Sequence, residues 1–75
     1  MSNYVILIER APDGYGAWCP DLPGCVALGD TIEETISEMQ DAMRCHLELM
    51  REDGLPIPAP NTVAATMTAV DVAAA

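Results

Sequence analysis

The sequence has few basic residues and an odd number of cysteines. Only three of its 75 residues are lysine or arginine, against twelve aspartates and glutamates, which gives a net charge of −9 at pH 7. This charge repels the phosphate backbone of nucleic acids, so we expect no direct nucleic-acid binding by the chain. Three cysteines do not pair into a disulfide framework, which favours reduced thiols in a cytoplasmic protein.

Long apolar runs and a targeting signal are also missing. Hydrophobic residues make up 51% of the chain, but no run approaches the roughly 18 residues that a membrane span needs. The N-terminus, MSNYVILIER, has no basic region before its apolar stretch and is too short for a signal peptide. We therefore expect no membrane association.

Acidic charge and small size are what the chain does have. The charge would attract a basic protein, although it is equally consistent with a role in solubility alone. Seventy-five residues make one domain, residues 1–75, with a small core and marginal stability. We expect a homo-oligomer, a dimer or tetramer, to add stability.

Three strands are predicted before a helix. The first is aliphatic and β-branched, and the turn Ala11–Gly14 joins it to the second. A rigid corner, PDLPG, separates the second from the third, which ends at Gly29. The predicted strands are residues 4–10, 15–19 and 25–28.

The helix is predicted over residues 32–53. Asp30 or Thr31 can cap its start, and Thr31 with Glu34 has the spacing of a capping box. Gly54 is the expected C-cap. One apolar stripe recurs at steps of three and four, formed by Ile32, Ile36, Met39, Met43, Leu47 and Met50.

After the helix, the three prolines of residues 55–61 predict an extended segment, and residues 63–72 are interpreted as a fourth strand. A right-handed crossover would bring this strand beside the first. The expected fold is α+β, a three-stranded antiparallel meander plus helix and a fourth strand (β-β-β-α-β), with sheet order 3-2-1-4.

One face of this sheet is expected to be uncovered. The first strand is apolar on both sides, with Ile6 and Ile8 on one and Val5 and Leu7 on the other. A single helix covers only one sheet face, so the other, with Trp18 as a candidate member, predicts a protein interface. The alternative is that the proline-rich segment or the tail folds across it.

The segment CPDLPGCVALGDTIEET, residues 19–35, resembles the signature of the HicB-like antitoxins. The flanks agree, with Tyr4 near the start of an apolar strand, Asp13-Gly14 in a turn, and the helix exit EDGLPIPAP. The resemblance covers residues 4–60. It implies a partial RNase H-like fold and a small basic partner, the toxin HicA, which cleaves RNA and is blocked by the antitoxin. Many members carry a C-terminal DNA-binding domain, for which this chain has no room, and Thr35 stands where the family commonly has alanine.

The hypothesis is therefore an antitoxin-like binding module, not an enzyme, which occludes the RNA-binding surface of a basic HicA-like RNase. The expected partner contacts are Glu9, Asp13, Trp18 and Asp21, although Asp21 is equally suited to bond its own turn. An orphan structural oligomer is an alternative. Expected structural residues of the corner and the helix cap are Pro20, Pro23, Gly24, Gly29, Asp30 and Thr31.

No metal or cofactor is expected. The chain has no CxxC pair, and adjacent Cys45 and His46 diverge by about 100° on a helix. A metal-dependent RNase H-like nuclease is a further alternative, since such enzymes need converging carboxylates. The candidate remnants of such a metal-binding site are Glu9, Glu38 and Asp71.

Overall fold

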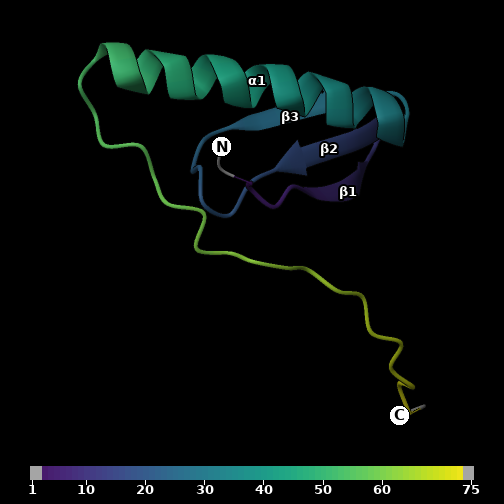
Figure 1. The fold of residues 1–75 in the computed structure, drawn as a ribbon. Helices are drawn as coiled ribbons and strands as arrows, with labels where there is room; N and C mark the ends of the chain where they lie inside the picture. The colour runs from purple at the N-terminus through teal and green to yellow at the C-terminus, as the bar shows by residue number, and fades with distance from the viewer. Residues whose placement is uncertain (1–2, 74–75) are drawn as a thin grey trace.

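A computed structural model describes residues 3–73 (Figure 1). Three strands are followed by one helix, in the order β1 (Leu7–Ala11), β2 (Gly14–Trp18), β3 (Val26–Gly29) and α1 (Ile32–Glu52). The α+β class and the three-stranded antiparallel meander agree with the expectation from the sequence. No helix in the described part of the chain is both long and apolar enough to span a membrane.

The strands form one antiparallel sheet in the order β1-β2-β3. Pro12 and Asp13 make the turn between β1 and β2, and Leu7 at the start of β1 pairs with Trp18 at the end of β2. Trp18 in turn pairs with Val26 of β3. Strand β2 is therefore central, and β1 and β3 are the two edges.

The predicted fourth strand is not seen: within residues 3–73, the segment 63–72 forms no strand and joins no sheet. The observed order is thus the 3-2-1 part of the predicted 3-2-1-4. The alanines of this segment give it a weak intrinsic preference for a strand. Two hydrogen bonds just before the segment also fix its starting point, and from there it runs away from the body (Figure 1).

The helix begins and ends with side-chain and backbone caps. Thr31, rather than Asp30, is the N-cap, and its hydroxyl oxygen accepts a hydrogen bond from the Glu34 amide at 3.1 Å. At the other end, the amide of Gly54 donates to the Arg51 carbonyl and the amide of Leu55 to that of Met50. This pair of bonds is the Schellman arrangement, which ends the helix next to the predicted residue, Gly54.

The helix packs over β3 and β2 rather than over β1 (Figure 1). The apolar stripe is buried through its middle, but Ile32 is 45% exposed, contrary to the prediction. Thr35 takes the buried position at that end, because β3 comes close to the helix at Gly29. The buried apolar core consists of Ala17, Cys19, Leu22, Cys25, Met39 and Met43.

The corner between β2 and β3 is two consecutive β-turns. The amide of Leu22 donates to the Cys19 carbonyl, and the amide of Cys25 donates to the Leu22 carbonyl. Pro20 and Pro23 each stand second in their turn, where a fixed φ suits the geometry, and Gly24 has φ +83°. Leu22, which the two turns share, is completely buried, so the corner fastens the end of the sheet to the core.

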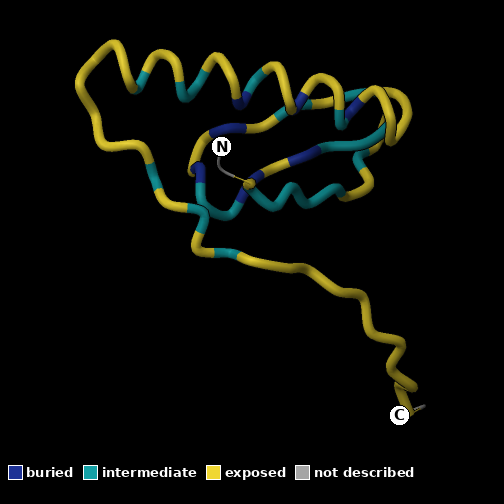
Figure 2. The backbone as a smooth tube through the Cα atoms, viewed as in Figure 1, coloured by how far each residue is buried: buried dark blue, intermediate teal, exposed yellow. Residues whose placement is uncertain are grey.

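The segment after α1 first returns to the body and then leaves it. The Tyr4 hydroxyl donates to the Pro58 carbonyl, and four residues later the Thr62 amide donates to Asp21 Oδ2 at 3.0 Å. Between these two hydrogen bonds, the Asn61 amide donates to the Ala59 carbonyl. Figure 2 shows the chain beyond this point as exposed.

Candidate functional site

The sheet face opposite α1 carries an exposed apolar row. Cross-strand partners share a sheet face, and successive residues alternate between faces. Ile8 and its partner Ala17 pack into the core beneath the helix. The neighbouring row, Leu7, Trp18 and Val26, therefore lies on the opposite face. Trp18 is 40% exposed and Val26 64% exposed, so nothing in the described chain covers this row.

A second row on the same face consists of Glu9, Gly16 and Leu28. Leu28 is 73% exposed. Because Gly16 has no side chain, an open depression of about 280 Å³ remains between Glu9, Trp18 and Leu28. We define the open face as these two rows. It is apolar apart from one carboxylate, Glu9.

Three carboxylates stand at one end of the open face. Asp13 in the β1–β2 turn and Asp30 and Glu34 at the start of α1 line a depression of about 490 Å³. Leu28 lines this depression and the one at Gly16, so the acidic end and the apolar rows are continuous. The arrangement suits an apolar partner surface with lysine or arginine at its border.

The four predicted contact residues are divided between two parts of the molecule. Glu9 and Trp18 lie together on the open face, and Asp13 lies at its acidic end. Asp21 is at the opposite end of β2, in the corner, where its Oδ2 accepts the Thr62 amide. This bond joins Asp21 to a residue 41 positions away and not to its own turn, and its role as a partner contact stays a prediction.

Two apolar members of the open face, Val26 and Leu28, are not among the predicted contacts. The residue types carry no signal for them, because residues 25–28, CVAL, are all apolar. In the structure, exposure alternates along this strand with a period of two, so that Cys25 is buried, Val26 exposed, Ala27 half-buried and Leu28 exposed. Which face the helix covers depends on tertiary packing, so the sequence alone did not select Val26 and Leu28.

The cysteines and the histidine do not gather into a site. Cys19 and Cys25 are buried free thiols, and burial, followed by the nearby Cys19, raises the pKa of Cys25 above its ordinary 9.0. Cys45 is an exposed thiol on the helix, with half-buried His46 beside it. Among residues 3–73, no three His, Cys, Asp or Glu side chains are grouped to hold a metal ion.

The carboxylates considered for a nuclease also lie on separate parts of the structure. Glu9 is on the open face of β1, Glu38 is exposed on α1, and Asp71 is exposed in the segment after the helix. Metal-dependent nucleases need carboxylates that converge on their cations. The described residues do not bring these three together.

Comparison with known proteins points to one family. Residues 4–75 match the family model described as the HicB-like antitoxin of bacterial toxin–antitoxin systems. The chain is 40% identical over 60 residues to an uncharacterised 14.9 kDa protein of Haemophilus phage HP1, covering 80% of this chain and 45% of that protein. It is 33% identical over 60 residues to Antitoxin HicB 2 of Photorhabdus laumondii, covering 80% of this chain and 43% of the antitoxin. The chain thus spans less than half the length of these two relatives.

The fold also occurs in a solved toxin–antitoxin assembly. A chain of the HicA3 and HicB3 toxin–antitoxin complex superimposes with a TM-score of 0.68 at 30% sequence identity. The match covers 76% of the present chain and 66% of that chain.

Proposed function

The chain belongs to the HicB-like antitoxin family of bacterial toxin–antitoxin systems, and we propose that it neutralises a small basic RNase of the HicA type by covering the toxin's RNA-binding surface. The observation that carries this proposal is the open face, an exposed apolar patch with carboxylates at its end. In this proposal the chain acts by binding, not by catalysis.

The charge of the chain supports a basic partner. A surface that binds RNA is positively charged, and the net charge of −9 on 75 residues attracts it from a distance. Attraction of this kind accelerates encounter and aligns the two surfaces before contact. Asp13, Asp30 and Glu34 are concentrated at one end of the open face, so they would orient the toxin along it.

The apolar rows support a stable complex after encounter. Tightly bound interfaces have a desolvated apolar centre, in which tryptophan is enriched, within a polar border. Trp18, between Leu7 and Val26, occupies such a centre, and the depression at Gly16 can receive one side chain of the toxin. Glu9 beside it can pair with a lysine or arginine that would otherwise contact RNA.

Two matched variants test this assignment. Val26→Asp places a charge on the open face, and Leu49→Asp places the same charge on the outer side of α1, at residues that are 64% and 60% exposed. With a small basic HicA-type RNase as the binding partner, Val26→Asp is expected to weaken binding by at least about tenfold, equivalent to about 1.4 kcal/mol. Leu49→Asp is expected to bind like the wild type.

The readouts are titration calorimetry and the residual cleavage of RNA by the toxin. Equal binding by the two variants would show that the open face is not the contact surface. Continued RNA cleavage in the presence of saturating wild-type chain would rule out neutralisation by occlusion. Circular dichroism checks that both variants are folded.

The fold itself is part of the proposal. The family resemblance implies a partial RNase H-like arrangement, and a right-handed crossover would add a fourth strand beside β1. The three strands and the helix of the described chain support this part of the proposal.

A further inference from the structure

We propose that residues 63–72 form the missing fourth strand on a second copy of the chain, paired with the outer edge of that copy's β1, so that two chains exchange these segments. The proposal concerns self-association and does not depend on the toxin. It rests on an open strand edge, an open groove beside it, and an exposed apolar segment in the same molecule.

The receiving edge is β1. Strand β2 occupies one side of β1, and no strand among residues 3–73 occupies the other. The β1–β2 ladder ends at Leu7 and Trp18, so the apolar residues 4–6 before it have no strand partner on either side. An added strand would give backbone partners to residues 4–11 and remove an exposed edge, which soluble proteins otherwise have to protect.

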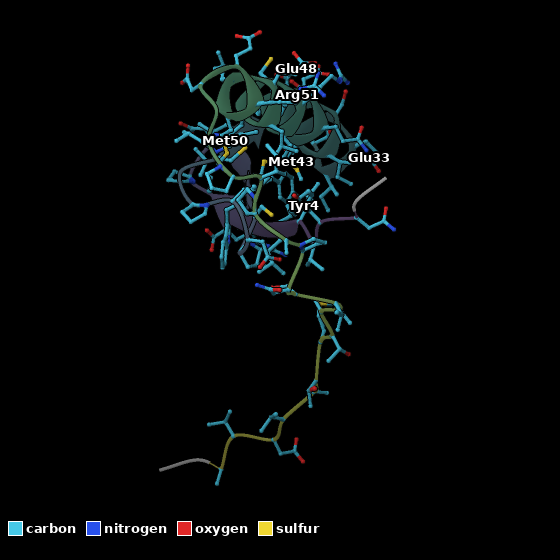
Figure 3. All side chains as sticks on the ribbon, turned by 60° about the vertical axis from the view of Figure 1, so that its left-hand side comes forward. Tyr4, Glu33, Met43, Glu48, Met50 and Arg51 are labelled. Atoms are coloured by element: carbon cyan, nitrogen blue, oxygen red, sulfur yellow. The ribbon has the colours of Figure 1, made fainter. Side chains whose placement is uncertain are left out.

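The groove lies between the start of the chain and α1. Because the helix packs over β3 and β2, the core is open on the β1 side, in a depression of about 510 Å³. Tyr4, Ile6, Met43 and Leu47 contribute its apolar wall. Figure 3 shows Tyr4 beneath Met43, on the side of the body from which the C-terminal segment departs. A strand beside β1 would place every second side chain over this groove.

The exchanged segment has the composition and length for this position. Val63 and Met67 are 90% and 98% exposed and lie an even number of residues apart, so they share one side of an extended strand. Val70 and Val72 are exposed on the other side. The ten residues 63–72 are enough to span the eight residues, 4–11, of the open edge. An apolar segment of this kind is exposed only while it lacks a partner.

The path of the chain favours a second copy over its own edge. After passing Tyr4 at the start of β1, the chain is hydrogen-bonded through Thr62 to Asp21 in the β2–β3 corner. The segment thus begins at the corner, not at the outer side of β1, and then extends away from the body (Figures 1 and 3). To pair with β1 of its own chain, the segment would have to change direction and return to the body. The β1 edge of a neighbouring chain can bind the segment in its observed extended path.

Charge favours the same arrangement. Two chains of net charge −9 repel each other, but residues 63–73 carry a single charge, Asp71. The segment is therefore the part of the chain that approaches an acidic copy at least electrostatic cost. Exchange at the β1 edge also leaves Trp18, Val26 and Leu28 on the open face, so that each copy in the dimer can bind a toxin.

The test is the mass of the full chain in sedimentation equilibrium without toxin. The wild type is expected at twice the 8.0 kDa chain mass. Met67→Asp is expected to raise the dimer dissociation constant at least about tenfold. The control Leu49→Asp adds the same charge at another exposed apolar residue and is expected to leave the dissociation constant unchanged.

A proline pair tests the strand itself. Neighbouring amides in a strand point to opposite sides, so only one of Ala65→Pro and Thr66→Pro removes a hydrogen bond to β1. We expect one of these variants to dissociate the dimer and the other to keep it. Both substituted residues are exposed in the single chain, so the circular dichroism spectrum of the folded body is expected to be unchanged in both variants.

Four results would overturn the proposal. These are a monomeric wild type, a dimer that is insensitive to Met67→Asp, a dimer that is equally sensitive to both prolines or to neither, and a dimer lost in Val26→Asp, which would show association through the open face. Toxin binding separates this proposal from the proposed function, because Met67→Asp is expected to retain it and Val26→Asp to lose it.

Discussion

Gly29, the last residue of β3, lies directly against Thr35 of α1. A Cβ atom at Gly29 would stand 2.6 Å from Thr35 Oγ1 and 2.7 Å from Thr35 N, closer than such atoms approach. Thr35 is completely buried, and its hydroxyl donates to the Thr31 carbonyl at 2.7 Å. The contact therefore sets how closely the start of the helix approaches the sheet.

Replacement of Gly29 by alanine is expected to destabilise the fold. The new methyl group meets the helix backbone, which cannot move aside without disturbing the core, so the cost should be about 1–3 kcal/mol. The matched control is Gly16→Ala, whose Cβ would stand 3.4 Å from the end of the Leu28 side chain and 3.9 Å from the Ala27 carbonyl oxygen, both ordinary contact distances. Urea unfolding measures both. If the two variants unfold at the same urea concentration, the close approach at Gly29 is not what positions the helix.

The cap at Thr31 gives a second stability prediction. Thr31→Ala removes the acceptor for the Glu34 amide and is expected to lower the free energy of unfolding by about 1 kcal/mol. Thr31→Ser keeps a hydroxyl oxygen at this position and is expected to unfold close to the wild type. The measurement is the thermal or urea midpoint, and a loss of equal size in both variants would contradict a role for the hydroxyl bond.

The buried thiol of Cys25 gives a pH prediction. Burial and the neighbouring Cys19 raise the pKa of Cys25 in the folded chain, so the unfolded chain releases this proton first as the pH rises. The stability that the protonated thiol contributes is complete below its ordinary pKa of 9.0 and is lost as the pH rises through the folded value. The free energy of unfolding should fall less steeply above pH 9.0 in Cys25→Ala. An unchanged slope in that variant would contradict the shift.

The acidic end of the open face gives a kinetic prediction. Asp13→Lys reverses one charge at an exposed turn, so association with a basic toxin should slow about two- to tenfold at low salt and lose part of its salt dependence. Stopped-flow association at several salt concentrations measures this. The control Glu52→Lys makes the same charge change at the far end of α1, and equal slowing in both would indicate that only net charge matters.

Local features of the fold were predictable from neighbouring residues. The predicted helix range agrees with the observed one to within one residue. This was possible because Thr31 and Gly54 cap the helix through hydrogen bonds to residues only a few positions away. The turn at Asp13 and the corner at Pro20 and Pro23 are likewise set by residues that restrict their own backbone. Ile32 was assigned to the apolar stripe from the helical period, but it is exposed, because the position of β3 decides which residue is buried at that end of the helix.

The candidate site was predictable only in part. An uncovered apolar face was predicted because a single helix can cover only one of the two apolar faces of a sheet. The structure places Trp18 on this face. Asp21 was harder to interpret, because its bond to Thr62 joins residues 41 positions apart and leaves no local pattern. The fourth strand was predicted from its residue types and placed beside the first by the crossover rule, and neither includes the Asp21–Thr62 bond that fixes where the segment begins.

The amino-acid sequence by itself determined the charge, the three strands, the helix with its caps and the family signature, because each depends on residue type or on contacts within a few positions. Tertiary structure alone decided which sheet face the helix covers, that Val26 and Leu28 join Trp18 on the other, and that residues 63–72 leave the body. The physical reason is that the packing of α1 on β3 and β2 and the hydrogen bond between Asp21 and Thr62 join parts of the chain that no local sequence pattern relates.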